Sequence, residues 1–178
     1  MAEEIVLVDL FDRETGYGEK LKVHRERKLH RAFSLFVADE EGNLLLQKRA
    51  EGKYHSGGLW TNACCSHQPR GETLVEAVVR RTREELGIEV VPKELFSFLY
   101  FRDFGDLAEY ELDHVFLAVY RGNRGDIHPD AGEIGDLQWI RPGDLKQRLE
   151  EEPSIFTAWF LTAAPVVLRM LMQGEKQC

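Results

Sequence analysis

The most reactive side chains of this sequence gather in residues 61–67, where two adjacent cysteines precede a histidine. One residue separates Cys65 from His67, and Cys64 completes the pair of thiols. The segment that follows, residues 71–87, has the pattern of a helix that carries carboxylates and arginines. A thiol, an imidazole and carboxylates so close together in the chain indicate metal-assisted chemistry.

The arginines and glutamates of that helix are spaced so that they can meet in pairs. Arg80 and Glu84 are four residues apart, as are Arg81 and Glu85, so each pair shares one helical face. In an isolated helix, two exposed salt bridges would be the ordinary interpretation. The alternative is that Glu85 binds a divalent cation while Arg81 contacts a phosphate.

Hydrophobic periodicity and turn residues predict the elements that must position these side chains. The expected strands are residues 4–12, 31–38, 44–49, 88–91, 95–101, 109–120 and 137–140. The expected helices are residues 73–86, with Gly87 as C-cap, 142–151 and 154–172, with Pro165 as a kink or break. The second and third strands form a hairpin, and a long ordered loop spans residues 50–70. The pattern favours an α/β protein with a mixed β-sheet flanked by helices.

Length and composition favour one globular domain over residues 1–178. No apolar run approaches the roughly 20 residues of a membrane-spanning helix, and the start lacks signal-peptide features, so we expect a cytoplasmic protein. Three cysteines, one of them Cys178, do not make a disulfide framework, and free thiols are expected. The net charge of −8 disfavours a nucleic-acid partner, although basic residues can still surround a pocket. A monomer is expected.

The predicted helix and the loop before it resemble the Nudix box, with which Nudix enzymes hold magnesium on a diphosphate. The matching residues are Glu72, Arg80, Glu84, Glu85 and Gly87. Three positions depart from the box, because Ser66 stands at its opening glycine, Thr82 stands at an aliphatic position, and Arg81 replaces a glutamate that usually binds metal in the hydrolases. An arginine there points towards holding a diphosphate without cleaving it.

Further motifs resemble the type I isopentenyl-diphosphate isomerases, which share the Nudix fold. These motifs are residues 29–34, 59–67 and 156–159, together with Glu109 and Glu111. They follow the family's order from about residue 24 to residue 159, which is most of the chain. The resemblance implies a Nudix-type α/β/α sandwich that interconverts isopentenyl diphosphate and dimethylallyl diphosphate, small molecules of isoprenoid biosynthesis.

The implied reaction moves a double bond by adding a proton at one carbon and removing another two carbons away. Such a step needs an acid and a base on opposite sides of a dry pocket. The resemblance assigns these roles to Cys65 and Glu111. It also implies that Tyr100 assists the acid and that Trp159 offers its π face to a carbocation-like state.

The resemblance further implies a divalent metal, either Zn²⁺, Mn²⁺ or Mg²⁺, at a cluster of imidazoles and carboxylates. The implied ligands are His24, His30, His67, Glu109 and Glu111. This set suits an octahedral site, and the two glutamates, two residues apart on a strand, share one face. Taken alone, each histidine is better interpreted as an ordinary surface or core residue than as a metal ligand. The match of three histidines to ligand positions of the family reverses that preference.

A second metal ion, Mg²⁺, is implied on the diphosphate, held by Glu85. Lys20, Arg49, Lys53 and Arg81 match the family's phosphate contacts and would form an anion site within an acidic protein. For Arg49 and Lys53, the ordinary alternative is a solvated loop, and for Lys20 a solvated position is as good an interpretation as a phosphate contact.

Two other functions fit the sequence. One is a Nudix hydrolase of a nucleoside or isoprenoid diphosphate, which Glu84 and Glu85 support, whereas Arg81 and Cys65 argue against it. The other is a non-catalytic, metal-bearing protein that binds diphosphates. This alternative is supported by departures from the isomerase pattern near residues 61–67. The departures are at Gln68, His55 and Ser56.

Overall fold

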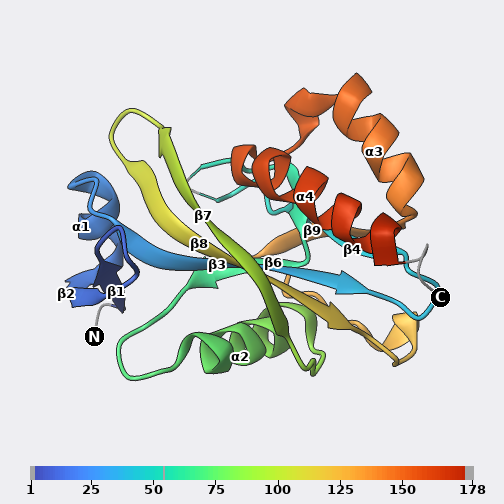
Figure 1. Cartoon of the computed structure of the whole chain (residues 1–178), viewed down its shortest axis with the longest axis horizontal. Helices are drawn as coiled ribbons and strands as arrows, with labels where there is room; N and C mark the ends of the chain where they lie inside the picture. The colour runs from blue at the N-terminus through green and yellow to red at the C-terminus, as the bar shows by residue number, and fades with distance from the viewer. Residues whose placement is uncertain (1–2, 54, 175–178) are drawn as a thin grey trace.

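The central element of the fold is strand β3 (His30–Ala38), and both of its edges are paired with other strands. The computed structural model describes residues 3–53 and 55–174. Strand β8 (Ala108–Val119) runs parallel to β3 along one whole edge. The other edge is shared in succession by β1 (Glu4–Val8), β6 (Cys64–His67) and β4 (Leu44–Arg49), all antiparallel. Strands β6 and β8 therefore approach β3 from opposite sides (Figure 1).

The remaining strands extend the sheet outward from this centre. Strand β2 (Glu14–Glu19) pairs with β1, and β7 (Lys93–Asp103) pairs with β8. Strands β5 (Trp60–Asn62) and β9 (Ile134–Ile140) both pair with β4. Within the described residues, the nine strands form one mixed sheet.

Helices cover both faces of the sheet, which makes the three layers of the predicted sandwich (Figure 1). Helix α2 (Leu74–Leu86) packs on one face, and α4 (Ala158–Gly174) with α3 (Pro142–Glu151) covers the other. The short elements are α1 (Lys20–Arg25) and the 3₁₀ turns η1 (Arg124–Asp126) and η2 (Pro153–Ile155). Among residues 3–53 and 55–174, no helix has the length and apolar character to cross a membrane.

The two hydrophobic cores follow from the alternation of side chains along β3. Leu35 and Val37 join the core beneath α2, whereas Phe36 joins the core beneath α4. His30 and Ser34 have the same parity as Phe36, so they lie on the face that α4 covers. The polar half of this face, near the start of β3, is where the candidate site forms.

Many of the predicted elements are confirmed, as is the α/β class with its mixed sheet between helices. Strand β4 and helix α3 have the predicted bounds. Helix α2 starts after a capping box at Thr73 and ends at Gly87, whose φ of 70° is left-handed. Helix α4 differs from the prediction in two ways, because it begins at Ala158 and not at residue 154, and it continues through Pro165 without a break. Cys64 and Cys65 are free thiols, and Cys178 lies outside the described residues.

Other predictions about the chain were wrong or incomplete. Residues 50–70 are not one loop, because they contain β5 and β6, and the reactive segment lies on these strands. Residues 88–91 are not a strand. Strand β2 and helix α1 were not predicted. The β3–β4 hairpin has only two residue pairs, Val37 with Leu45 and Ala38 with Leu44, because β6 occupies the edge of β3 beside them.

Candidate active site

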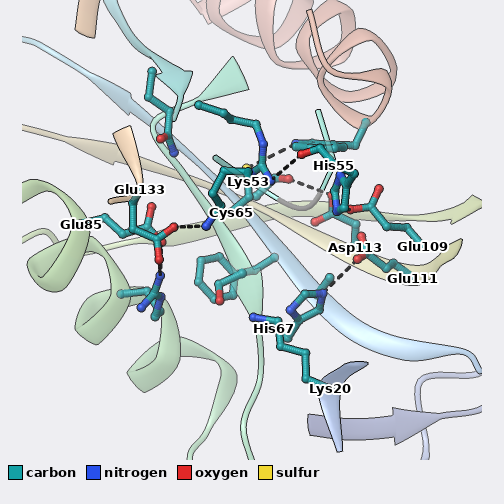
Figure 2. A pocket seen from close by; sticks show the side chains of 18 residues that line it. Lys20, Lys53, His55, Cys65, His67, Glu85, Glu109, Glu111, Asp113 and Glu133 are labelled. Atoms are coloured by element: carbon teal, nitrogen blue, oxygen red, sulfur yellow. Dashed lines mark hydrogen bonds and ion pairs between the residues drawn. The ribbon is translucent and has the colours of Figure 1, made fainter. Parts of the chain in front are cut away.

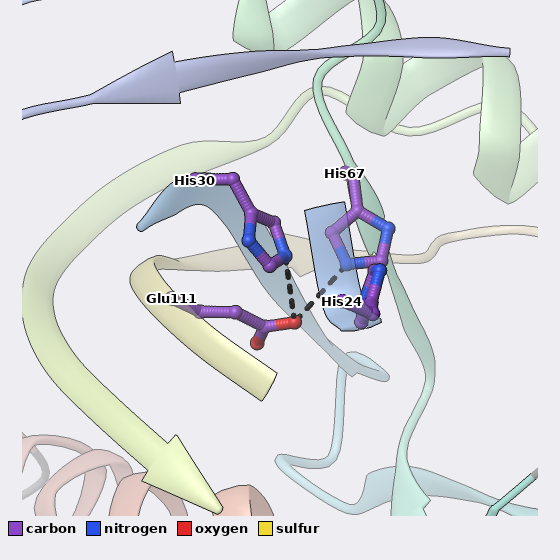
Figure 3. Close-up of side chains that lie close together, drawn as sticks. All are labelled: His24, His30, His67 and Glu111. Carbon is purple, nitrogen blue, oxygen red and sulfur yellow. Dashed lines mark hydrogen bonds and ion pairs between the residues drawn. The ribbon is translucent and has the colours of Figure 1, made fainter. Parts of the chain in front are cut away.

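Four buried side chains from four different elements converge on one point (Figure 3). They are His24 of α1, His30 of β3, His67 of β6 and Glu111 of β8, and their ligand atoms all lie within 4.8 Å of one another. Nε2 of His67 lies 3.0 Å from Oε1 of Glu111, and Nε2 of His30 lies 3.5 Å from the same oxygen. Four of the five ligands predicted for this metal site thus lie together, although they come from distant parts of the chain. The fifth, Glu109, is not part of the cluster.

Backbone carbonyls orient two of the imidazole rings. Nδ1 of His24 donates to the carbonyl of Lys20 at 2.6 Å, and Nδ1 of His30 donates to the carbonyl of Lys28 at 2.8 Å. A neutral ring that donates through Nδ1 has its lone pair on Nε2, the tautomer of a metal ligand. Burial lowers the pKa of His24 and of His67, which favours their neutral forms. Neutral imidazoles around a carboxylate are a fitting donor set for a divalent cation.

Glu111 is the carboxylate at the centre of this cluster. Burial alone would raise its pKa, but the adjacent imidazoles of His30 and His67 outweigh burial and hold the pKa of Glu111 below its usual value. Glu111 is therefore ionised at neutral pH, as a metal ligand or a proton acceptor must be.

Glu109 shares the strand face of Glu111, as predicted, but contacts a different histidine. Its Oε1 lies 3.0 Å from Nε2 of His55, a residue in the segment between β4 and β5. The ring of His55 also stacks on Phe104, with ring centroids 4.5 Å apart. Burial and the charge of Glu111 raise the pKa of Glu109. The structure therefore holds Glu109 beside the cluster of four ligands and not within it.

Cys65 faces the same pocket from β6. Its Sγ lies 3.1 Å from Oδ1 of Asn62, to which the thiol donates, and accepts a hydrogen bond from Nε1 of Trp159 at 3.3 Å. Burial raises the pKa of Cys65 to about 12, so Cys65 carries its proton at neutral pH. Cys64 points the other way, into the core beneath α2, because adjacent strand residues face opposite sides.

Trp159 and Tyr100 lie next to each other, with ring centroids 6.5 Å apart. Trp159 lines the pocket, and the guanidinium of Arg49 lies over its ring at 5.3 Å from the centroid. Tyr100 pairs with Glu111 across β7 and β8. Burial and the nearby carboxylates of Glu109 and Glu111 raise the pKa of Tyr100, but this side chain is not among the pocket's lining residues.

All four predicted phosphate-binding cations line this pocket, namely Lys20, Arg49, Lys53 and Arg81. Figure 2 labels two of them, Lys20 and Lys53. Arg81 forms the predicted contact with its helical neighbour Glu85, with Nη2 2.5 Å from Oε1. The same Nη2 lies 3.2 Å from Oε1 of Glu133, whose other carboxylate oxygen pairs with Lys53. In Figure 2, Glu85 and Glu133 lie to one side of Cys65, and Glu109 and Glu111 lie to the other.

Three titratable residues of the pocket received no functional role in the sequence analysis: His55, Asp113 and Glu133. Asp113 could have been found, because it continues the alternation of Glu109 and Glu111 along β8. Its Oδ2 accepts a hydrogen bond from Ser34 at 2.8 Å. Glu133 precedes β9 and carries no local signal, since only the folded chain brings it to α2.

The departure at Gln68 has a structural account. Its side-chain oxygen accepts a hydrogen bond from Nη1 of Arg31 at 2.7 Å, and its amide donates to the carbonyl of Glu72 at 2.6 Å. Gln68 thereby ties β3 to the segment that leads into α2.

Comparison with known proteins agrees with this architecture. The family model described as NUDIX domain matches residues 28–160, so the chain belongs to the NUDIX family. A crystal structure of a Deinococcus radiodurans protein has a TM-score of 0.74 at 20% identity, over 92% of this chain and 98% of that one. A MutT protein from Methanosarcina mazei has a TM-score of 0.64 at 19% identity, over 83% and 96% of the two chains. These two share the fold.

Sequence relatives narrow the family further. An isopentenyl-diphosphate Delta-isomerase 2 of Photorhabdus laumondii is 44% identical over 163 residues, covering 90% of this chain and 89% of the relative. An isopentenyl-diphosphate Delta-isomerase of Photobacterium profundum is 42% identical over 175 residues, covering 95% and 96%. The resemblance to the type I isopentenyl-diphosphate isomerases, noted from the motifs, is thereby confirmed.

Proposed function

We propose that this enzyme interconverts isopentenyl diphosphate and dimethylallyl diphosphate, with Cys65 and Glu111 as the proton-transfer pair. The observation that carries the proposal is the pairing of a protonated thiol with an ionised carboxylate in one pocket. Because β6 and β8 flank opposite edges of β3, the two groups reach the pocket from opposite sides. An allylic shift needs that arrangement of acid and base.

Cys65 acts as the acid in the forward direction. Its thiol carries a proton at neutral pH, and its Sγ accepts the indole N–H of Trp159 at 3.3 Å. When the thiol gives its proton to the alkene, this N–H stabilises the thiolate that forms. Thr61, whose Oγ1 lies 3.8 Å from Sγ, supports the same charge. In the reverse direction the thiolate takes the proton back.

Glu111 accepts the proton that leaves the other carbon. The face of the Trp159 ring, which lines the pocket, supplies electron density to the positive charge that develops between the two proton transfers. We propose that Tyr100 assists the acid side through its hydroxyl, which burial keeps protonated.

We propose two divalent ions, since the donor sets fit them. His24, His30, His67 and Glu111 would hold Zn²⁺, Mn²⁺ or Mg²⁺, with Glu109 as a fifth ligand that His55 holds nearby in this structure. The buried carboxylate of Glu85 is the oxygen donor that Mg²⁺ prefers. When bound, the first ion keeps Glu111 ionised and the second offsets the charge of the diphosphate.

The diphosphate of the substrate would bind to Lys20, Arg49, Lys53 and Arg81. Their shared pocket supports this assignment, because it brings four cationic side chains together in a protein whose net charge is −8. We also propose that the chain is a single domain and that it acts in the cytoplasm as a monomer. Size-exclusion chromatography tests the oligomeric state.

Proton NMR of isopentenyl diphosphate, incubated in heavy water with the purified protein, Mg²⁺ and a reductant, tests the function. Growth of dimethylallyl signals with incorporated deuterium is the expected result. Release of inorganic phosphate or diphosphate from an otherwise unchanged alkene would instead identify a hydrolase. An unchanged substrate, in a protein that holds metal, would identify a binding protein and overturn the proposal.

A further inference from the structure

Glu133 joins two of the pocket's cations to each other. One of its carboxylate oxygens pairs with Nζ of Lys53, and the other lies 3.2 Å from Nη2 of Arg81. Lys53 comes from the segment after β4, Arg81 from α2, and Glu133 from the segment before β9. A carboxylate that bridges two cations with two oxygens occupies them as a phosphate group would.

The backbone holds Glu133 in this position. The carbonyl of Glu133 accepts a hydrogen bond from the amide of Ala50 at 2.9 Å. This bond fixes the backbone of Glu133 to the residue that follows β4. Its own amide donates to the carbonyl of Asp130 at 3.0 Å. Lys53 and Arg81 hold the pKa of Glu133 below its usual value despite partial burial, so the carboxylate is ionised at neutral pH.

The charges of this end of the pocket cancel. Arg81 and Lys53 contribute two positive charges, and Glu85 and Glu133 contribute two negative charges when both are ionised. Both carboxylates contact the same guanidinium nitrogen, Nη2 of Arg81. When a diphosphate binds Arg81 and Lys53, it displaces the two carboxylates from these cations. The carboxylates then lie close to the negative charge of the diphosphate and repel it.

We infer that Glu133 is an internal counter-anion that competes with the substrate's diphosphate for Lys53 and Arg81, and thereby makes diphosphate binding depend on a divalent cation. This inference rests on one part of the proposed function, namely that Lys53 and Arg81 bind the diphosphate. A bare diphosphate must displace Glu133 and tolerate the repulsion of two carboxylates. A divalent cation that arrives with the diphosphate is attracted by those same carboxylates, so it removes both obstacles.

Calorimetric titration of inorganic diphosphate, with EDTA and with Mg²⁺, tests this inference without any turnover. Wild-type protein is expected to bind the metal-free diphosphate weakly and the magnesium complex more tightly. Glu133→Gln keeps the shape and removes the charge, so its affinity for metal-free diphosphate is expected to rise at least about tenfold. The gain that Mg²⁺ brings is expected to shrink in the same variant.

Glu152→Gln is the matched control. Glu152 pairs with Arg148 at 3.6 Å, and neither residue lines this pocket, so the variant is expected to bind like wild type in both buffers. The inference is overturned if Glu133→Gln binds metal-free diphosphate no better than wild type. If wild-type protein binds diphosphate in neither buffer, the assigned diphosphate site fails as well, which separates the two failures.

Discussion

Cys64 and Cys65 are adjacent thiols with opposite surroundings. Cys65 faces the pocket and Trp159, whereas Cys64 is buried in the core beneath α2. We expect Cys65→Ala to lower turnover by roughly 10²–10⁴, the usual contribution of a general acid, and to leave diphosphate binding intact. Cys64→Ala is expected to keep its turnover within about twofold, since it deletes only one buried sulfur. NMR rates and calorimetry measure both, and near-normal turnover in Cys65→Ala would refute the assignment.

The protonation state of Cys65 has its own test. Because burial raises its pKa to about 12, the thiolate fraction at pH 8 is roughly 10³-fold smaller than for a thiol of pKa 9. In the Cys64→Ala variant, alkylation of Cys65 by iodoacetamide is expected to rise about tenfold per pH unit from pH 8 to 10. Peptide mass spectrometry follows the reaction. A plateau near pH 9 would show a thiol of ordinary pKa and refute the effect of burial.

Among the elements, α2 is the one whose ends the sequence specifies most fully. Oγ1 of Thr73 accepts the amide of Glu76 at 3.3 Å, and the carboxylate of Glu76 accepts the amide of Thr73 at 2.8 Å. Thr73→Ala removes half of this capping box and is expected to cost about 1 kcal/mol of unfolding free energy. Thr73→Ser keeps the hydroxyl and is expected to lose only a few tenths. Urea denaturation compares the two, and equal losses would contradict the role of the cap.

Elements with strong local patterns could be predicted, and elements defined by their partners could not. Strand β4 and helix α2 carry their apolar spacing and turn residues within their own sequence. Strand β6 has four residues and no alternation, so it became a strand only by pairing with β3. The same is true of the site. The sequence motifs predicted His67 and Glu111, whereas Glu133 could be recognised only in the folded structure. Residues 88–91 show the converse, since strand formers without a partner made no strand.

At the scale of the molecule, the candidate metal site connects parts of the chain that are far apart in sequence. His24 belongs to α1, His67 to β6 and Glu111 to β8, so an ion that binds them holds three elements to β3, which carries His30. Such an ion binds the folded chain and not the unfolded one, because only folding brings the four side chains together.

Metal is therefore expected to stabilise the whole fold. At a metal concentration about 100 times the dissociation constant, the gain is about 2.7 kcal/mol, which raises the melting temperature by roughly 5–10 °C for a chain of this size. Thermal melts of protein treated with EDTA, with and without added Zn²⁺, Mn²⁺ or Mg²⁺, measure the shift. His24→Ala is expected to lose it, whereas His128→Ala, an exposed histidine outside the site, keeps it. An equal shift in both variants would place the ion elsewhere, because only His24 lies in the cluster that binding must hold together.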